Sequence, residues 1–296
     1  MHTKEMRHLG ISSASRRLQG QQGSVFQRVV RGMLAVSVIA TVASGASLQS
    51  ASASGTTGEK DHVVTSASPL SMVCPPAGSQ AVASPFHGKP DNDGFPAAAA
   101  WDGPPTATFC SDWRGQNSDP TLQTNVHVLW SSSTLYLRFQ ARYKDLNLYP
   151  EKNQHKDRLW LRDVAEVFLQ PPGSNKAGYK ELEVSPNGNW FAVSIISYEE
   201  EKVEKWKCDL KSKGDIDESQ HIWTGELAIP MECLTKQFDP AANWRVNFFR
   251  IEGLAGRDKR ETKDSHRFYS AWHPTNTERP FFHVPEVFGE LKFASE

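Results

Sequence analysis

Nine tryptophans stand out in this chain, because several of them lie beside polar or turn-forming residues rather than inside apolar runs. Indole faces stack on the flat C–H faces of sugar rings, while nearby carboxylates, amides and guanidinium groups bond to the hydroxyls. The composition therefore suggests a glycan-binding surface, and the alternative is that each ring belongs to the core or its rim. The tryptophans in polar surroundings are Trp101, Trp113, Trp160, Trp190 and Trp272.

Catalytic motifs are missing from the sequence, which has no G-x-S-x-G, H-E-x-x-H, P-loop or G-x-G-x-x-G pattern. Asp163 and Glu166 stand three residues apart, and on a regular strand that spacing directs them to opposite faces. A glycosidase needs two carboxyl groups that converge on one sugar ring. We therefore expect a binding protein that is not an enzyme.

Four cysteines follow the N-terminal region, and no pair has the C-x-x-C spacing of a zinc or thioredoxin-like site. In an oxidising compartment one or two disulfides are expected. The pairings nearest in sequence are Cys74–Cys110 and Cys208–Cys233. Free buried thiols are the alternative.

The N-terminal region predicts export to the periplasm, the cell surface or the medium. A long basic segment ends at Arg31, an apolar stretch runs from Met33 to about Ala46, and Ala51-Ser52-Ala53 has the small-x-small pattern of a cleavage site. The apolar stretch is too short and polar for a good membrane span, and an uncleaved anchor helix is the alternative. Residues 54–296 hold 27 basic and 33 acidic residues, an acidic balance that argues against nucleic acid as a partner.

The remainder divides into a flexible Ser/Ala-rich linker over residues 54–74 and one all-β domain over 75–296, after a signal peptide over 1–53. Short alternating runs separated by turns predict a β-sandwich or jelly roll with no long helix. The predicted strands are Thr124–Trp130, Leu135–Arg142, Ala165–Gln170, Tyr179–Ser185, Trp190–Ile196, His221–Ile229, Trp244–Ile251 and Gly289–Phe293.

The segment from Leu159 to Leu169 resembles the W-x-x-D-x-x-E-[VI]-F core motif of family 9 carbohydrate-binding modules. The likeness covers about residues 95–293, and the order and spacing of its pieces make it specific. The other pieces are Trp101-Asp102-Gly103, Val128–Trp130 with Leu135–Phe139, Tyr179–Val184 with Pro186-Asn187-Gly188, Gly225–Pro230 and Phe288–Leu291.

This resemblance implies a β-sandwich that binds the ends of glucan or xylan chains without cleaving them, in the service of glycoside hydrolases. It assigns stacking to Trp160 and hydroxyl bonding to Glu166, six residues later. The family's second tryptophan is replaced near Phe281 and Phe282. A family Arg and Asn fall near Glu183 and Ser185, which puts the family's sugar specificity in doubt. Further candidate contacts are Arg162, Asn276 and Trp272.

Three further possibilities stay open. Some family members bind structural calcium, for which Asp91, Asp93 and Asp102 are candidates, although no cofactor is required and solvated turns are the alternative. The same sandwich superfamily includes haem-binding DOMON-type redox domains, which would use Met231 with His221 or His273 as axial ligands. The third possibility is a surface structural module that has lost its sugar site.

Overall fold

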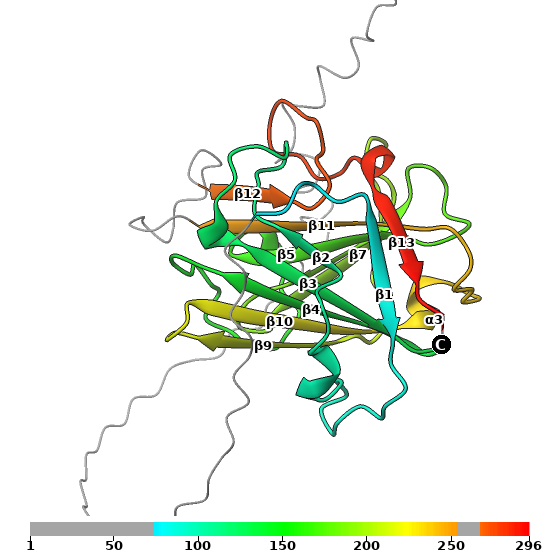
Figure 1. Cartoon of the computed structure of the whole chain (residues 1–296). Coiled ribbons are helices and arrows are strands. Elements are labelled where there is room, and N and C mark those ends of the chain that lie inside the picture. The colour runs from blue at the N-terminus through cyan, green and yellow to red at the C-terminus, as the bar shows by residue number, and fades with distance from the viewer. Residues whose placement is uncertain (1–73, 254–266, 296) are drawn as a thin grey trace, which may run out of the picture.

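The computed structural model describes residues 74–253 and 267–295, so the predicted signal peptide and nearly all of the predicted linker lie outside the described residues. The described strands form a β-sandwich of two layers, which confirms the predicted fold class (Figure 1). The first layer contains β8 (Lys202–Lys205), β7 (Trp190–Ser197), β6 (Tyr179–Val184), β5 (Val164–Gln170), β11 (Trp244–Gly253) and β13 (Gly289–Phe293), with β12 (Arg267–Ala271) beside β11. The second contains β3 (Thr124–Trp130), β4 (Thr134–Arg142), β10 (Ile222–Pro230) and β9 (Lys211–Asp217), with β2 (Ala107–Phe109) beside β3.

Strand β1 (Gln80–Pro85) belongs to both layers. Its first four residues pair in parallel with β13, and Ser84 and Pro85 pair in parallel with β3. Figure 1 shows β1 in cyan beside β13 in red. One strand that changes partners therefore makes the hydrogen-bonded system continuous between the layers.

The eight strands predicted from alternation are all present. The bounds of Thr124–Trp130 and Gly289–Phe293 agree with β3 and β13, and the others differ by one or two residues at an end. The sequence did not indicate β1, β2, β8, β9 or β12. Helix is limited, within the described residues, to single turns such as η3 (Leu159–Leu161) and α3 (Met231–Leu234).

The main core lies between the layers, and the first layer is also covered on its outer face. On β5, Ala165, Val167 and Leu169 point into the main core. Val164 and Phe168 alternate with them and join a second cluster on the outer face. Glu166 stands between these two, so alternation places its carboxyl group on the outer face as well.

The turn between β6 and β7 holds the segment that leads to η3. Gly188 adopts φ +78°, which a side chain would strain. Asn187 Nδ2 donates to the carbonyl oxygens of Tyr149 (2.7 Å) and Glu151 (2.8 Å), and Asn189 Nδ2 donates to Glu151 (2.7 Å). The predicted Pro-Asn-Gly-Asn turn thus positions a distant loop as well as joining two strands.

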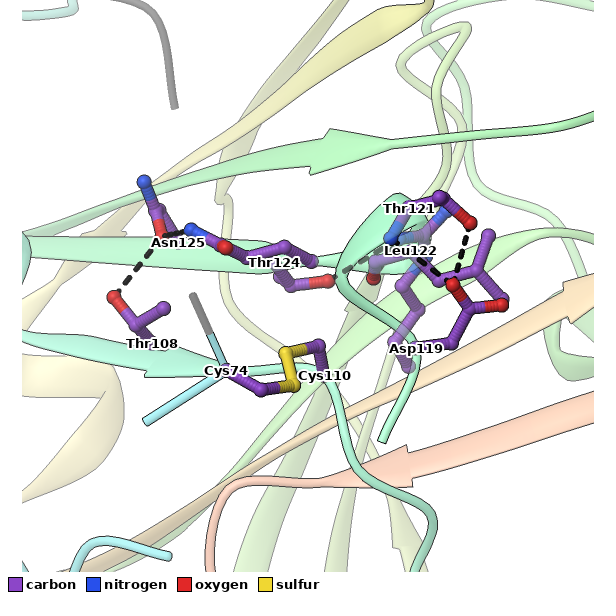
Figure 2. The surroundings of a disulfide bond; sticks show 10 residues. Cys74, Thr108, Cys110, Asp119, Thr121, Leu122, Thr124 and Asn125 are labelled. Atoms are coloured by element: carbon purple, nitrogen blue, oxygen red, sulfur yellow. Dashed lines mark hydrogen bonds between the residues drawn. A yellow bond between two sulfur atoms is a disulfide. The ribbon is translucent and has the colours of Figure 1, made fainter. Parts of the chain in front are cut away.

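Two disulfides join the cysteine pairs that are nearest in sequence. Cys74 is bonded to Cys110 at the end of β2, beside the Thr108–Asn125 and Asp119–Thr121 hydrogen bonds (Figure 2). Cys208 is bonded to Cys233 in α3 and ties the loop after β8 to the end of β10. None of the described helices has the length and apolar character needed to cross a membrane.

Candidate functional site

Trp160 lies in η3, on the outer face of the first layer. Its half-buried indole meets the ring of Phe191 edge-on, with centroids 5.4 Å apart. The Arg267 guanidinium donates to the carbonyl oxygens of Trp160 (2.7 Å) and Arg162 (2.9 Å), and so holds both sides of the turn. The indole is therefore fixed at its backbone and leaves part of its surface exposed.

Three glutamates lie under the same outer face. Glu166 on β5 stands directly opposite Glu183 on β6, and Glu181 lies two residues along the same face of β6. The exposed fractions of Glu166, Glu181 and Glu183 are 3%, 3% and 0%. Cross-strand neighbours have Cβ atoms roughly 5 Å apart, and like charges in such pairs repel. We call these three residues the glutamate triad.

Burial raises the pKa of every member of the glutamate triad. The pKa of Glu181 rises to about 8. The pKa of Glu166 is raised well above its usual value by burial and then by the charge of Glu181, and Arg267 opposes part of this rise. The pKa of Glu183 is also raised, by burial and by its two carboxylate neighbours. With a pKa of about 8, Glu181 holds its proton at neutral pH, and a protonated carboxyl donates a hydrogen bond as well as accepting one.

Aromatic residues surround the glutamate triad. Phe168, Phe191 and Phe249 are cross-strand neighbours of Glu181, Glu183 and Glu166 respectively. Glu166 Oε1 is buried and has no hydrogen-bond partner among the described residues. An unpaired buried oxygen costs about 1–3 kcal/mol. The combination of half-exposed indole, apolar walls and polar oxygens without partners is the composition of a site for a polar ligand with apolar faces.

A second set of rings lies beside Glu181. His283 stacks on Tyr198 at 3.8 Å and shares a 2.7 Å hydrogen bond with Tyr179 Oη. Its Nδ1 is 3.9 Å from Glu181 Oε2. Burial lowers the pKa of His283 to about 3, so the ring is neutral at neutral pH and does not compensate the triad.

Comparison with known proteins shows the family of this domain. Residues 93–296 match the sequence model of the carbohydrate family 9 binding domain-like family. The chain belongs to this family. The family 9-like domain is also 23% identical, over 185 residues, to an "Extracellular protein" of Arthroderma benhamiae, a match that covers 59% of this chain and 80% of that protein.

The family 9-like domain is similar to solved structures. A candidate carbohydrate-binding protein from Bacteroides uniformis superposes with a TM-score of 0.51 at 16% identity, covering 74% of this chain and all of that one. A family 9 module from Caldicellulosiruptor kristjanssonii in complex with cellotriose gives a TM-score of 0.47 at 14% identity, covering 73% and 94% of the two chains.

Phe281 and Phe282, the residues predicted near the position of the family's second tryptophan, lie on the outer face of the first layer. Phe282 is 7% exposed and stacks on Phe249 at 4.2 Å, so it forms a wall and does not present an open ring face. Phe281 is half-buried and meets Tyr198 edge-on at 5.5 Å. Phe282 and Trp160 thus belong to one outer-face cluster, and Glu166 lies on the same face of the first layer.

Three other candidates form no hydrogen bond or ion pair with the glutamate triad among the described residues. The Arg162 guanidinium lies 4.8 Å from the Tyr149 ring centre and donates to the carbonyl of Leu161. Trp272 is 3% exposed and packs against Phe248 in the core between the layers, so its ring cannot serve as a sugar platform. Asn276 is exposed in a loop, with φ 56°.

The calcium and haem alternatives lose support from this placement. The Asp93 carboxylate already pairs with Lys213 (2.9 Å) and accepts from Phe95 N (3.0 Å), and the described residues contain no group of three suitable metal ligands. Asp91 and Asp102 are therefore not gathered with it into a site.

Met231, the candidate haem ligand, is buried in the main core at one end of β10, and His221 precedes the other end. Nine residues at about 3.3 Å each separate them, which excludes their joint ligation of one iron.

Sequence reasoning did not select Glu181, Glu183 or Arg267. The alternation of Tyr179, Glu181 and Glu183 with Leu182 and Val184 carried the signal that the carboxyl groups share a face. Charged residues at alternating positions normally indicate a solvent-facing side, so the pattern alone does not reveal that these carboxyl groups are buried. The sequence before Arg267 lacks the alternation of apolar and polar residues that predicts a strand, so nothing indicated where Arg267 would lie.

Proposed function

We propose that the outer face of the first layer binds carbohydrate, with Trp160 stacking on a sugar ring and the glutamate triad bonding to its polar groups. The observation that carries this proposal is the position of a half-buried, backbone-fixed indole on the same face as buried carboxyl oxygens, among them Glu166 Oε1, which has no hydrogen-bond partner among the described residues. The family membership supports it, and the C. kristjanssonii modules were solved with cellotriose and glucose. Chain ends of glucan or xylan type are the proposed ligands.

Replacing Trp160 with alanine should weaken binding about tenfold, because an aromatic stack contributes about 1–1.5 kcal/mol. Isothermal titration with cellobiose, xylobiose and soluble xylan measures the effect. Trp206→Ala is the matched control, since Trp206 is also half-buried but packs against the main core between the layers. Absence of binding to every glycan, or equal losses in both variants, would overturn the proposal and favour a structural module without a sugar site.

Non-catalytic binding is part of the proposal, because the matched family is one of binding domains. Asp163 is turned away from the site and accepts hydrogen bonds from the backbone N–H groups of Asn147 and Gly253. Glu166 therefore has no converging partner in Asp163 of the kind a glycosidase uses. Any part in polysaccharide breakdown would be indirect, through hydrolases that act on the bound chain.

We also infer that the protein is exported. The N-terminal pattern of a basic segment, an apolar stretch and Ala51-Ser52-Ala53 supports this, as do two disulfides, which persist in oxidising compartments. The A. benhamiae relative is described as extracellular. Mass spectrometry of the protein from its native host should find a mature chain that begins near residue 54. A full-length chain retained in the cytosol would contradict export.

A further inference from the structure

The glutamate triad is short of positive charge. Among the described cations, Arg267 acts on Glu166, but its guanidinium already donates to the carbonyl oxygens of Trp160 and Arg162. His283, whose Nδ1 lies 3.9 Å from Glu181 Oε2, is neutral at neutral pH. If Glu166 and Glu183 ionised opposite each other, their carboxylates would repel, and a neutral ligand could not compensate that repulsion whereas a cation could.

The acceptor chemistry of the triad suits an ammonium group in particular. A protonated amine has three N–H donors and no acceptor, whereas a hydroxyl donates one hydrogen. Three carboxyl groups on two adjacent strands can receive these donors together, and hydrogen bonds between charged partners are about twice as strong as neutral ones. Aromatic faces beside the carboxyls would add attraction between the cation and the ring. Phe191 and Phe249 are placed for this as cross-strand neighbours of Glu183 and Glu166, and Trp160 meets Phe191.

The oxygen atoms also point to a missing donor. Glu166 Oε1 is a buried oxygen without a hydrogen-bond partner among the described residues, in a side chain that is 3% exposed. Its cross-strand partner Glu183 is fully buried. Such a site is costly to keep unless a ligand supplies donors to it.

We propose that this face selects glycans that carry a free protonated amine, that is, amino sugars without the N-acetyl group, and that Glu166, Glu181 and Glu183 receive the ammonium. The proposal rests on the proposed function, because it takes Trp160 as the stacking surface for the sugar ring. It adds to that function that the ammonium group of the ligand is the source of selectivity.

Binding of a protonated amine should release a proton from the triad, whereas binding of a neutral ligand should not. Carboxyl groups that hold protons in the free protein must release one when they pair with an ammonium, so the bound proton goes to the buffer. The heat of binding measured in two buffers of different ionisation enthalpy gives the number of protons released. Binding of a neutral disaccharide should release none from this cause.

Isothermal titration at pH 6.5 with three disaccharides tests the idea on the full chain: chitobiose with free amines, its di-N-acetylated form, and cellobiose. We expect chitobiose to bind at least tenfold tighter than the other two and to release about one proton. Glu183→Gln should reduce that preference at least fivefold, while Glu204→Gln, which removes an exposed carboxylate from β8, should preserve it. Thermal unfolding of both variants checks that each is folded.

The outcomes separate this inference from the proposed function. Cellobiose binding as tightly as chitobiose would overturn amine selectivity and leave carbohydrate binding intact. Failure of all three sugars would overturn both. A preference for chitobiose that persists in Glu166→Gln and Glu183→Gln would remove the triad as its cause. A lysine-containing tripeptide that binds as tightly as chitobiose would show that the site recognises amines without regard to sugar, and would overturn the assignment to glycans.

Discussion

Replacing Arg250 with alanine should lower the free energy of unfolding by about 3–5 kcal/mol, the cost of removing one partner of a buried ion pair. Arg250 and Glu252 form an ion pair in which both side chains are almost fully buried. Arg250 Nη1 also donates to the carbonyl of Leu122 (2.9 Å) and to Thr124 Oγ1 (3.3 Å), which links β11 to the start of β3. Alanine would leave the Glu252 carboxyl group buried and without this cation. Urea unfolding followed by fluorescence measures the change.

Two controls show whether burial is the reason. Lys202→Ala breaks the Lys202–Glu200 pair, whose side chains are 63% and 61% exposed, and should cost less than 1 kcal/mol. The double replacement Arg250→Met with Glu252→Leu removes both buried charges together and should recover much of the loss. If Arg250→Ala cost no more than Lys202→Ala, the buried pair would not hold the two layers together.

The central strands could be predicted because each has one apolar face toward the main core. Val126, Val128 and Trp130 on β3, for example, alternate with polar neighbours and join the main core. The strands that were missed give a different signal. β8 and β9 lie at the sheet edges and are rich in lysine and acidic residues, as edge strands that avoid aggregation often are. β1 contains a proline and changes layers, so no single periodicity describes it.

The candidate site could be predicted only in part, for a similar reason. The spacing of Trp160 and Glu166 survives folding because one short turn and half a strand connect them. The rest of the site depends on pairing between strands, which brings Glu183 opposite Glu166. Sequence also cannot tell an exposed tryptophan from a buried one when both have polar neighbours. Trp272 follows β12 directly and packs inward against Phe248, whereas Trp160 lies in η3 on the outer face.

Raising the pH from 6.5 to 8 should destabilise the protein by about 2 kcal/mol through Glu181 alone, and Glu181→Gln should remove that contribution. The pKa of Glu181 is about 8 in the folded chain against an ordinary value of 4.5. Between these values the folded state binds more protons than the unfolded state, so stability is full below pH 4.5 and is lost as the pH rises through 8. Glu166 and Glu183 have raised pKa values and act in the same direction.

Above pH 6.5 the effect of Glu181 can be measured apart from groups whose titration changes the stability in the opposite direction. His283 and His127 have pKa values lowered to about 3 and about 4, so their contributions raise stability with pH only below their unfolded pKa of 6.5. Asp163, with a pKa raised to about 6, has lost most of its own contribution by then. Chemical unfolding at pH 6.5, 7.25 and 8 should give a shallower slope for Glu181→Gln than for the parent, while Glu204→Gln, an exposed carboxylate, should follow the parent. Parallel slopes for the parent and Glu181→Gln would mean that Glu181 is ionised in the folded protein, and the charge deficit inferred for the glutamate triad would then have to be met by another cation.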